Sequence, residues 1–566
     1  MSRALPMGPG HGHGTSAPPP LGTPISTRDT ADVVLVGSGA AGGILARELA
    51  QAGLRVVVLE QGAYLDRSRF THDDTKVFLE PTYSVDHRRK PITWRPDEAT
   101  PAVTRPYLVY GTMIGGGTVH YAANSWRFRP IDFIEQTRGA TAAGTAVADW
   151  PFTYDELEPY YTRAEWELGI SGAPGPMDPA RSRPYPMPPL PLTGSGAVLE
   201  IAAARLGWRV QAAPMAIASQ PYRGRSNCQA CGFCWGFGCE YGAKGSTNFT
   251  MIPQAVATGR CELRPGCTAV QIETNAAGRA SAVVYRDARG REVRQRARLV
   301  VVAANGAETP RLLLMSASGR FPNGLGNGSG LVGRHLMFNG NAVVTGEMPE
   351  PMHGHKGPPV TRICLEAYDI GQEIGVAGGG GFDFRFMGGP LLWSQFFSRM
   401  PDVIGAPLKA HLRTAYSHGI LSLVHTTSLP SAANRIDLDP TVKDHLGLPA
   451  IRVTYTEHEQ DLRLMRAIQG KASQALEAGG ARKVEALPVS ADPGGGFHLL
   501  GTCRMGDDPT RSVVNRDHRM HEVPGLYLVD GSSFVSSGRG QPTLTIQALA
   551  FRAAARLAEA VKRGEA

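Results

Sequence analysis

The sequence predicts an α/β protein built on a mostly parallel sheet. Three observations support this fold class: a strand, a helix and a strand follow one another within residues 31–60, an apolar strand pattern occupies residues 299–304, and a strand pattern at residues 526–530 precedes a helical pattern at residues 545–562. Short apolar runs rich in Val and Leu are typical of strands buried on both faces, as in parallel sheets. Helical patterns beside such strands indicate helices packed on the sheet.

The first three elements form a complete β-α-β unit of about 30 residues. Its strands are residues 31–36 and 55–60, and its helix, residues 44–52, has apolar residues at helical spacing and ends before a glycine. The loop between the first strand and the helix is therefore the place where a ligand-binding motif is expected.

That loop carries a G-x-G-x-x-G motif made by Gly37, Gly39 and Gly42. The first glycine permits a tight turn, the second lets the backbone approach a pyrophosphate, and the third allows close packing of helix and strand. The helix N-terminus at Ala41 offers N–H groups to phosphates. Glu60, which ends the second strand, can accept hydrogen bonds from ribose hydroxyls and argues against NADP. The motif predicts a dinucleotide site, but FAD and NAD share it.

The rest of the chain is less regular. Residues 150–168 and 461–478 have helical patterns, and the Pro-rich residues 174–192 are expected to form a surface excursion. Residues 352–430 have a weak pattern with several aromatic residues, and we expect a mostly β layer there.

Composition excludes several classes of protein. The chain has 566 residues, of which 42% are hydrophobic and 19% charged, and this is typical of a globular protein. The net charge is +8, but no long block of Lys and Arg exists, so the sequence does not indicate nucleic-acid binding. No run of about 18 apolar residues predicts a membrane span.

The N-terminal segment has no apolar core of a signal peptide. Residues 1–29 are rich in Pro, Gly and His, and we expect a disordered tail. His11 and His13 could bind a metal weakly, but an inert tail is the simpler interpretation. Without a signal, the expected location is the cytoplasm, with export alongside a partner as the alternative.

A second glycine-rich loop follows well downstream of the β-α-β unit. It contains Gly116, Gly117 and His120, and Asn124 comes shortly after it. Consecutive glycines let the backbone run flat against a planar ring or a diphosphate. This loop therefore favours FAD over NAD.

Near the C-terminus, residues 497–506 read Phe-His-Leu-Leu-Gly-Thr-Cys-Arg-Met-Gly, and residues 538–546 read Gly-Arg-Gly-Gln-Pro-Thr-Leu-Thr-Ile. Together with the first motif, these segments resemble the glucose-methanol-choline (GMC) oxidoreductases. Residues 150–158 and 304–311 resemble internal signatures of the same family, so the resemblance covers most of the chain. It is greatest to the branch of gluconate, fructose and glucoside dehydrogenases. Pyranose and cholesterol oxidases and the aminoglycoside-biosynthetic 6′-alcohol dehydrogenases are also similar.

The resemblance implies bound FAD and two discontinuous domains. One is a Rossmann-like FAD-binding domain, and the other is an α+β substrate domain built on an antiparallel sheet. The implied boundaries assign residues 30–130, 225–335 and 492–566 to the FAD-binding domain, and residues 131–224 and 336–491 to the substrate domain.

The resemblance also assigns catalytic roles. An alcohol carbon gives up hydride readily only when its hydroxyl proton leaves in step, and histidine suits this as a base of near-neutral pKa. His498 matches the catalytic histidine of the family. Gln541 stands where the family has His or Asn. Gln carries the same amide group as Asn on a side chain that is one methylene longer. Either the pocket therefore has a different shape around it or the activity is weaker.

Further residues are expected at the flavin. His120 matches a histidine that carries covalent flavin in some relatives, and packing beside the flavin is its alternative role. Asp530 and Gly531 are expected beneath the flavin and Thr543 at its pyrimidine edge, although these could equally be turn and cap residues. The implied cofactor-binding set is Gly37, Gly39, Ala41, Gly42, Glu60, Gly116, Gly117, His120, Asn124, Asp530, Gly531, Pro542 and Thr543.

Four cysteines lie within twelve residues: Cys228, Cys231, Cys234 and Cys239. The first three have a spacing near that of bacterial iron–sulfur ligands, but the fourth gap differs and the following Pro is missing. An iron–sulfur cluster, packed thiols without a ligand, a disulfide and a zinc site all stay open. In related glucose and glucoside dehydrogenases, a cysteine-rich insert with another spacing carries a three-iron cluster that relays electrons to a cytochrome. The remaining cysteines are expected to be structural: Cys261, Cys267, Cys364 and Cys503.

The leading hypothesis is therefore FAD-dependent oxidation of an alcohol on a polyol, sugar or aminoglycoside to the aldehyde or ketone. An external electron acceptor or oxygen would then reoxidise the flavin, with a small subunit or cytochrome as a candidate partner. A sterol or long-chain alcohol oxidoreductase is the alternative enzyme, because residues 382–397 are rich in aromatic side chains. A non-catalytic flavin electron-transfer subunit or a redox-silent binding protein is a third hypothesis, and the presence of His498 argues against it.

Overall fold

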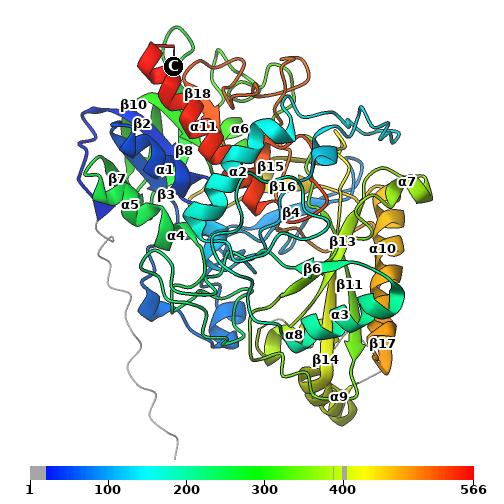
Figure 1. Cartoon of the computed structure of the whole chain (residues 1–566). Coiled ribbons are helices and arrows are strands. Elements are labelled where there is room, and N and C mark those ends of the chain that lie inside the picture. The colour runs from blue at the N-terminus through cyan, green and yellow to red at the C-terminus, as the bar shows by residue number, and fades with distance from the viewer. Residues whose placement is uncertain (1–20, 387, 398–403, 566) are drawn as a thin grey trace, which may run out of the picture.

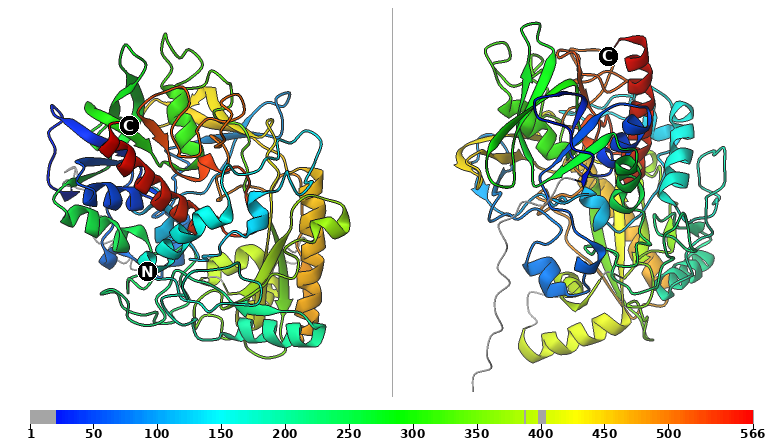
Figure 2. Two further views of the ribbon diagram at one scale, coloured as in Figure 1. Left: turned by 45° about the horizontal axis from the view of Figure 1, so that its top comes forward. Right: turned by 90° about the vertical axis from the view of Figure 1, so that its left-hand side faces the viewer.

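The structure of the protein is a computed structural model that describes residues 21–386, 388–397 and 404–565. His11 and His13 lie outside the described residues. Figure 1 shows a sheet covered by helices in the upper half and an antiparallel sheet with its own helices in the lower half, and Figure 2 shows the same two parts from other sides.

The upper half is organised by one long sheet with the strand order β1-β7-β3-β2-β10-β9-β8, and β18 pairs with β10. Strands β7, β3, β2, β10 and β18 pair in parallel, whereas β9 and β8 form an antiparallel extension. The strands are β1 (Leu21–Gly22), β2 (Thr30–Val36), β3 (Val56–Glu60), β7 (Cys261–Pro265), β8 (Thr268–Thr274), β9 (Ala280–Arg286), β10 (Glu292–Val302) and β18 (Leu526–Leu528).

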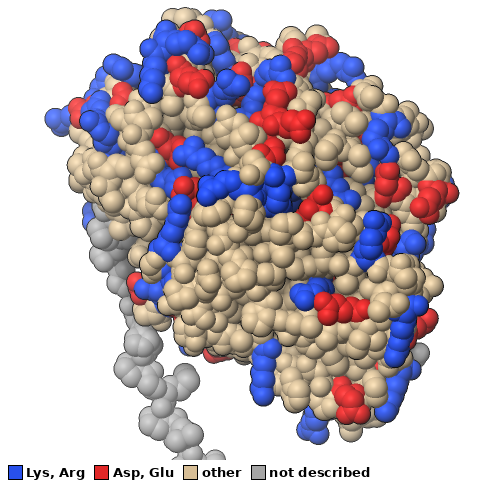
Figure 3. Space-filling view, viewed as in Figure 1, with Lys and Arg blue, Asp and Glu red and all other residues tan. Residues whose placement is uncertain are grey.

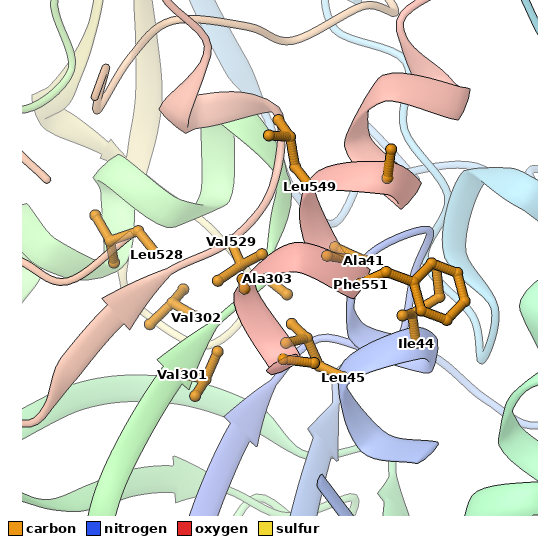
Figure 4. Close-up of a cluster of buried hydrophobic side chains, with 14 of the residues drawn as sticks. Ala41, Ile44, Leu45, Val301, Val302, Ala303, Leu528, Val529, Leu549 and Phe551 are labelled. Carbon is orange, nitrogen blue, oxygen red and sulfur yellow. The ribbon is translucent and has the colours of Figure 1, made fainter. Parts of the chain in front are cut away.

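Helices from both ends of the chain pack on this sheet. α1 (Gly42–Gln51) contacts α11 (Thr543–Arg563), and α11 in turn contacts α2 (Tyr154–Leu168). Figure 4 shows part of the core between them, where Phe551 of α11 lies beside Ile44 of α1. The sheet and its helices therefore hold the first strand's loop and the C-terminal segments together. The other helices here are α4 (Thr247–Thr250), α5 (Ile252–Ala257) and α6 (Asn305–Met315).

The lower half contains an antiparallel sheet with the order β17-β11-β14-β13-β12-β6. Helices α3 and α10 pack on it and enclose a second hydrophobic core. The strands are β6 (Val210–Ala212), β11 (Gly340–Glu347), β12 (Arg362–Cys364), β13 (Gly380–Arg385), β14 (Gly419–Thr426) and β17 (Lys483–Ala486), and the helices are α3 (Gly194–Leu206), α7 (Gly371–Ile374), α8 (Pro390–Phe397), α9 (Gly405–His418) and α10 (Glu459–Ala478).

A small sheet with the order β15-β16-β4-β5 joins distant parts of the chain. β4 (Ile92–Arg95) and β5 (Val103–Thr104) come from the N-terminal third, whereas β15 (Arg435–Lys443) and β16 (Pro449–Thr454) follow the antiparallel sheet. The remaining short helical turns are η1 (Arg67–Arg69), η2 (Thr75–Leu79), η3 (Gly116–Val119), η4 (Pro130–Phe133) and η5 (Gly531–Ser533).

Two local expectations were wrong. Residues 21–29 were assigned to the disordered tail, but β1 pairs with β7, and the Ile25 N–H donates to Glu262 at 2.8 Å. The region 352–430 is only partly β: it supplies β12, β13 and β14 but also α8 and α9. Because short aromatic and apolar runs suit strands and buried helices alike, their pattern could not separate the two.

On the face shown in Figure 3, basic and acidic side chains are interspersed. No described helix is both long enough and apolar enough to span a bilayer.

Candidate active site

A cavity of about 940 Å³ lies between the strand ends of the parallel sheet and the antiparallel sheet. This volume is near the upper end of the ~300–1,000 Å³ that is usual for ligand and cofactor clefts. Most residues singled out in the sequence line it, and Gly42 does not. The predicted residues in its wall are Gly37, Gly39, Ala41, Glu60, Gly116, Gly117, His120, Asn124, His498, Asp530, Gly531, Gln541, Pro542 and Thr543.

The first glycine-rich loop turns sharply between β2 and α1. Gly37 has φ +96°, and a Cβ there would lie 2.4 Å from the carbonyl oxygen of Ala303. Gly42 packs under this turn, since its Cβ would lie 2.1 Å from the carbonyl oxygen of Gly37. These glycines therefore allow the turn and the close packing of helix on strand, and they leave the N-terminus of α1 open to the cavity.

Glu60 fixes this loop from the end of β3. Its carboxylate accepts hydrogen bonds from the N–H and the hydroxyl of Ser38, at 3.1 and 2.7 Å, and from the N–H of Gly62 at 2.9 Å. Burial raises the pKa of Glu60, although these hydrogen bonds act in the opposite direction. The carboxylate lines the cavity at the position where the sequence predicted a contact to ribose.

The second glycine-rich loop lies directly against the first. The N–H of Gly115 donates to the Ser38 hydroxyl at 3.3 Å. Gly116 has φ +52°, and a Cβ on it would come within 2.8 Å of the Gly39 Cα. The two backbones thus form one cradle, in which a side chain at either glycine would fill the space beside the cavity.

Five polar side chains at the cavity have buried atoms that find no hydrogen-bond partner within the described chain. They are both amide atoms of Asn124, Nε2 of His120, Nδ1 of His498, the hydroxyl of Tyr83 and Nδ1 of His87. Because buried polar atoms are normally paired, such atoms point to a ligand that carries polar groups. Burial lowers the pKa of His120 to about 4, with the charge of Lys244 as a second cause, so its imidazole is neutral.

His498 is held in place by the backbone on both sides of it. The Gly496 N–H donates to Tyr107, the Leu500 N–H donates to Met337, and the Gly501 N–H donates to Gly531. Gly531 has no room for a side chain, because a Cβ would lie 2.5 Å from the carbonyl oxygen of Leu499. The end of β18 therefore positions the His498 segment.

The electrostatic surroundings keep His498 neutral. Burial lowers its pKa to about 3, and the neighbouring His425 acts in the same direction, whereas a hydrogen bond with Gln541 raises the pKa. A neutral imidazole is the form that a general base requires, but a pKa of about 3 lies well below the near-neutral value that suits this role best.

The turn at the C-terminal end of β18 has capping roles as well as a place in the cavity wall. Asp530 accepts hydrogen bonds from the Thr309 hydroxyl at 2.6 Å, the Ser532 N–H at 2.8 Å and the Asn305 N–H at 3.0 Å. Thr543 is the first residue of α11, and Pro542 precedes it. The helix N-terminus consequently faces the cavity beside Gln541.

Sequence reasoning missed part of this site. His425 on β14 lies with both ring nitrogens 3.0 Å from Nε2 of Gln541. Asp383 and Arg385 on β13 adjoin His425, and Arg385 lines the cavity. The signal that could have found them is the run Phe-Asp-Phe-Arg at residues 382–385, where charged residues alternate with apolar ones in a glycine- and aromatic-rich segment.

The aromatic residues of this region belong to the hydrophobic cores rather than to the cavity. Phe382 and Phe384 pack in the core beside α10, and Phe386 stacks on Trp393 with ring centroids 4.4 Å apart. Phe396 packs beside them, and the Phe397 side chain lies outside the described part. None of the described five lines the cavity, so the observation behind a sterol or long-chain substrate no longer supports it.

The cysteine-rich loop covers the cavity next to His120. All four of its cysteines are free thiols, and so are Cys261, Cys267, Cys364 and Cys503. The described residues contain no group of three or more His, Cys, Asp or Glu side chains arranged to hold a metal ion. The structure therefore supplies no geometry for iron–sulfur or zinc ligation by Cys228, Cys231, Cys234 and Cys239.

A buried lysine anchors this loop instead. The Lys244 ammonium donates to the carbonyl oxygens of Cys234 and Phe237, at 2.6 and 2.8 Å, and to those of Tyr121 and Val119, at 2.9 and 3.3 Å. It thereby ties the cysteine-rich loop to the backbone that follows the second glycine-rich loop.

Comparison with known proteins agrees with this geometry. Two family models described as GMC oxidoreductase match residues 99–339 and 430–550, and a model described as FAD binding domain matches residues 32–68. A 2-methyl-1,2-propanediol dehydrogenase of Mycolicibacterium austroafricanum is 34% identical, covering 93% of this chain and 95% of the relative. A paromamine 6′-oxidase of Streptomyces fradiae is 33% identical, covering 97% and 94%.

A solved structure shows the same fold. The formate oxidase of Aspergillus oryzae RIB40 superposes with a TM-score of 0.68 at 15% identity, covering 96% of this chain and 100% of that one. The paired glycine loops, Glu60 and the unpartnered polar atoms fit FAD as the cofactor. The predicted family is confirmed: the chain belongs to the GMC oxidoreductases and is an FAD-dependent alcohol oxidoreductase.

Proposed function

We propose that the protein oxidises a hydroxyl group of a polyol, sugar or aminoglycoside to the aldehyde or ketone, with His498 as the base. The observation that carries this proposal is the position of His498: a neutral imidazole opens into the same cavity as both glycine-rich loops. The two similar enzymes named above act on a diol and on an aminoglycoside, which supports a hydroxyl-rich substrate.

The cofactor, the two polar side chains and the glycine-rich loops have separate roles in this reaction. Bound FAD supplies the acceptor for the hydride that leaves the alcohol carbon. His498 removes the hydroxyl proton, and Gln541 orients the hydroxyl group from the end of α11. Gly37, Gly39, Gly116 and the N-terminus of α1 hold the cofactor's phosphates and ring by close backbone approach.

Two roles are consistent with His120. Its neutral imidazole lies in the cavity wall with Nε2 unpaired, so it either carries the flavin covalently or packs beside it. Acid precipitation separates these roles, because a covalent flavin stays yellow with the pellet.

The decisive experiment is a panel of alcohols with a dye acceptor, followed by anaerobic flavin reduction in His498→Ala. We expect this variant to keep FAD and to lose at least about 100-fold in the reduction rate, which is within the range for removing a general base. His445→Ala is the matched control, because His445 is exposed. Normal reduction in His498→Ala would remove His498 from the mechanism.

The electron acceptor and location are parts of the same proposal. We infer an external acceptor or oxygen, with a small subunit or cytochrome as the candidate partner, and a cytoplasmic location. Hydrogen peroxide formation during turnover would assign an oxidase, whereas turnover only with a dye would assign a dehydrogenase. Cell fractionation tests the location.

A further inference from the structure

The wall of the cavity opposite the parallel sheet is built by one face of β13 and β14. Because side chains alternate along a strand, Phe382 and Phe384 face the core under α10, whereas Asp383 and Arg385 lie on the other face. His425 of β14 adjoins Asp383 on that same face. A charged pair and an imidazole are thus buried together behind the cavity.

These groups form a continuous chain of polar contacts that ends at Gln541. Arg385 donates to Asp383 through Nε at 2.5 Å and through Nη2. Nε2 of His425 lies 3.3 Å from Oδ2 of Asp383 and 3.4 Å from Nη2 of Arg385. Gln541 then lies 3.0 Å from His425, and it shares a hydrogen bond with His498.

The chemistry of each group fixes the direction of the hydrogen bonds along this chain. Burial alone would raise the pKa of Asp383, but Arg385 and His425 hold it below its ordinary value, so the carboxylate is ionised and can only accept. His425 therefore donates from Nε2. The reverse tautomer would turn a lone pair toward this carboxylate at 3.3 Å and would leave only the longer contact to Nη2 of Arg385, at 3.4 Å, to satisfy it.

The tautomer of His425 in turn decides which way the Gln541 amide points. Burial lowers the pKa of His425, so its ring is neutral and its Nδ1 carries a lone pair. The amide NH₂ of Gln541 is the donor beside that nitrogen, at 3.0 Å. Nε2 of His425 lies equally close to this amide nitrogen. With the Nε2 N–H donated to Asp383, the carbonyl oxygen of Gln541 points away from His425.

We propose that Arg385, Asp383 and His425 are positioning residues that lock the Gln541 amide with its oxygen toward His498. The oxygen then accepts from the His498 ring and stabilises the imidazolium that forms when His498 takes the substrate proton. This inference rests on the proposed role of His498 as the base. It explains how Gln can replace the His or Asn of the family: its orientation is set from the antiparallel sheet.

The test compares two substitutions of His425. In His425→Asn, the side-chain oxygen can accept from Gln541 and the NH₂ can donate to Asp383, so the direction of the chain is kept. In His425→Leu, both contacts are lost. With an alcohol that reduces the wild-type flavin, anaerobic stopped-flow gives the limiting rate of flavin reduction and the apparent Kd of the alcohol.

We expect His425→Leu to retain FAD and to lose at least about tenfold in the limiting rate, with the alcohol Kd within about threefold, because misplacing a reacting group costs rate rather than binding. His425→Asn should stay within about threefold of the wild type in both. Equal loss in the two variants, or no loss in His425→Leu, overturns the proposal.

If His425→Leu does not fold, Gln541→Glu tests the same chain, because a carboxylate cannot donate to Nδ1 and the limiting rate should again fall. Histidine-selective ¹⁵N NMR of the holoenzyme gives a readout independent of turnover. The signals lost in His425→Asn should be those of a neutral ring protonated on Nε2, and a ring protonated on Nδ1 overturns the proposal. Failure of every alcohol to reduce the wild type would instead refute the proposed function and leave this readout intact.

Discussion

The buried ammonium of Lys244 gives the sharpest test of how the cavity wall is held together. Lys244→Met keeps most of the side-chain stem and removes the charge with its three N–H donors. These donors serve four backbone carbonyl oxygens at 2.6–3.3 Å, contributed by the cysteine-rich loop and by the segment after the second glycine-rich loop.

The magnitude follows from opposing terms. A hydrogen bond from a charged donor contributes about 1.5–3 kcal/mol net, so three of them correspond to about 4.5–9 kcal/mol. Burying an ammonium costs several kcal/mol, and the same burial lowers the pKa of Lys244. Since methionine removes that cost too, we expect a net loss of about 2–4 kcal/mol in the free energy of unfolding.

Urea unfolding of the FAD-loaded protein measures this loss, with tryptophan fluorescence for the chain and flavin fluorescence for cofactor release. Flavin release should move to lower urea at least as far as chain unfolding, because the loop covers the cavity beside His120. Lys562→Met is the matched control, because Lys562 is exposed at the end of α11. A change below about 1 kcal/mol in Lys244→Met, with flavin release unaltered, would refute this account of the loop.

Three further predictions concern the cradle and two buried titratable groups. Gly116→Ala combines a left-handed φ with a Cβ contact at 2.8 Å. FAD should bind about 5- to 30-fold more weakly by equilibrium titration, since strain of about 1–2 kcal/mol acts on the bound loop. Gly290→Ala, which has φ +76° but open space, should bind FAD normally. Burial lowers the pKa of His518 to about 3, so near pH 6.5 the unfolded chain binds a proton there and the folded chain does not. Stability is therefore lost as pH falls from 6.5 toward 3, and His518→Asn should remove about 2 kcal/mol of the loss between pH 7 and pH 5 in urea titrations. A variant whose stability falls with pH as steeply as that of the wild type would contradict the assignment. Burial, aided by the neighbouring Asp461, raises the pKa of Glu457 well above its ordinary value. The folded chain therefore holds a proton that the unfolded chain releases, and stability falls as pH rises above 4.5. Glu457→Gln should gain melting temperature relative to the wild type at pH 8 more than at pH 5, and an equal gain at both would be the contrary result.

The parts of the fold that the sequence predicted are those with local signals. The β-α-β unit was predictable because strand, turn and helix patterns follow one another within thirty residues, and α10 was predictable from its apolar spacing. Its observed start at Glu459 depends on His458, whose ring accepts from the Gln460 N–H at 3.2 Å, a cap that composition does not reveal. The helix α8 was missed because its short apolar run fits a strand equally well. The helix α9 was missed although Leu408, Leu412 and Tyr416 lie at helical spacing.

The same distinction applies to the site. His498 and the glycine loops were found because each belongs to a contiguous motif. His425 and Asp383 lie 42 positions apart in sequence and meet only because β13 pairs with β14 in one register. A shift of one residue in either strand would turn its own side chain to the opposite face, so the meeting of the two depends on tertiary structure that no local pattern encodes.

This register also explains why the replacement of the family's His or Asn by Gln541 depends on the antiparallel sheet. The extra methylene of Gln541 lets its amide contact His425 at 3.0 Å while it shares a hydrogen bond with His498. A shorter amide at this position would fall short of one of the two rings. If it left Nδ1 of His425 buried and unpaired, the cost would be about 1–3 kcal/mol. Position 541 and the polar pair on β13 therefore act as one unit, in which the antiparallel sheet sets the orientation of a group that the parallel-sheet domain supplies.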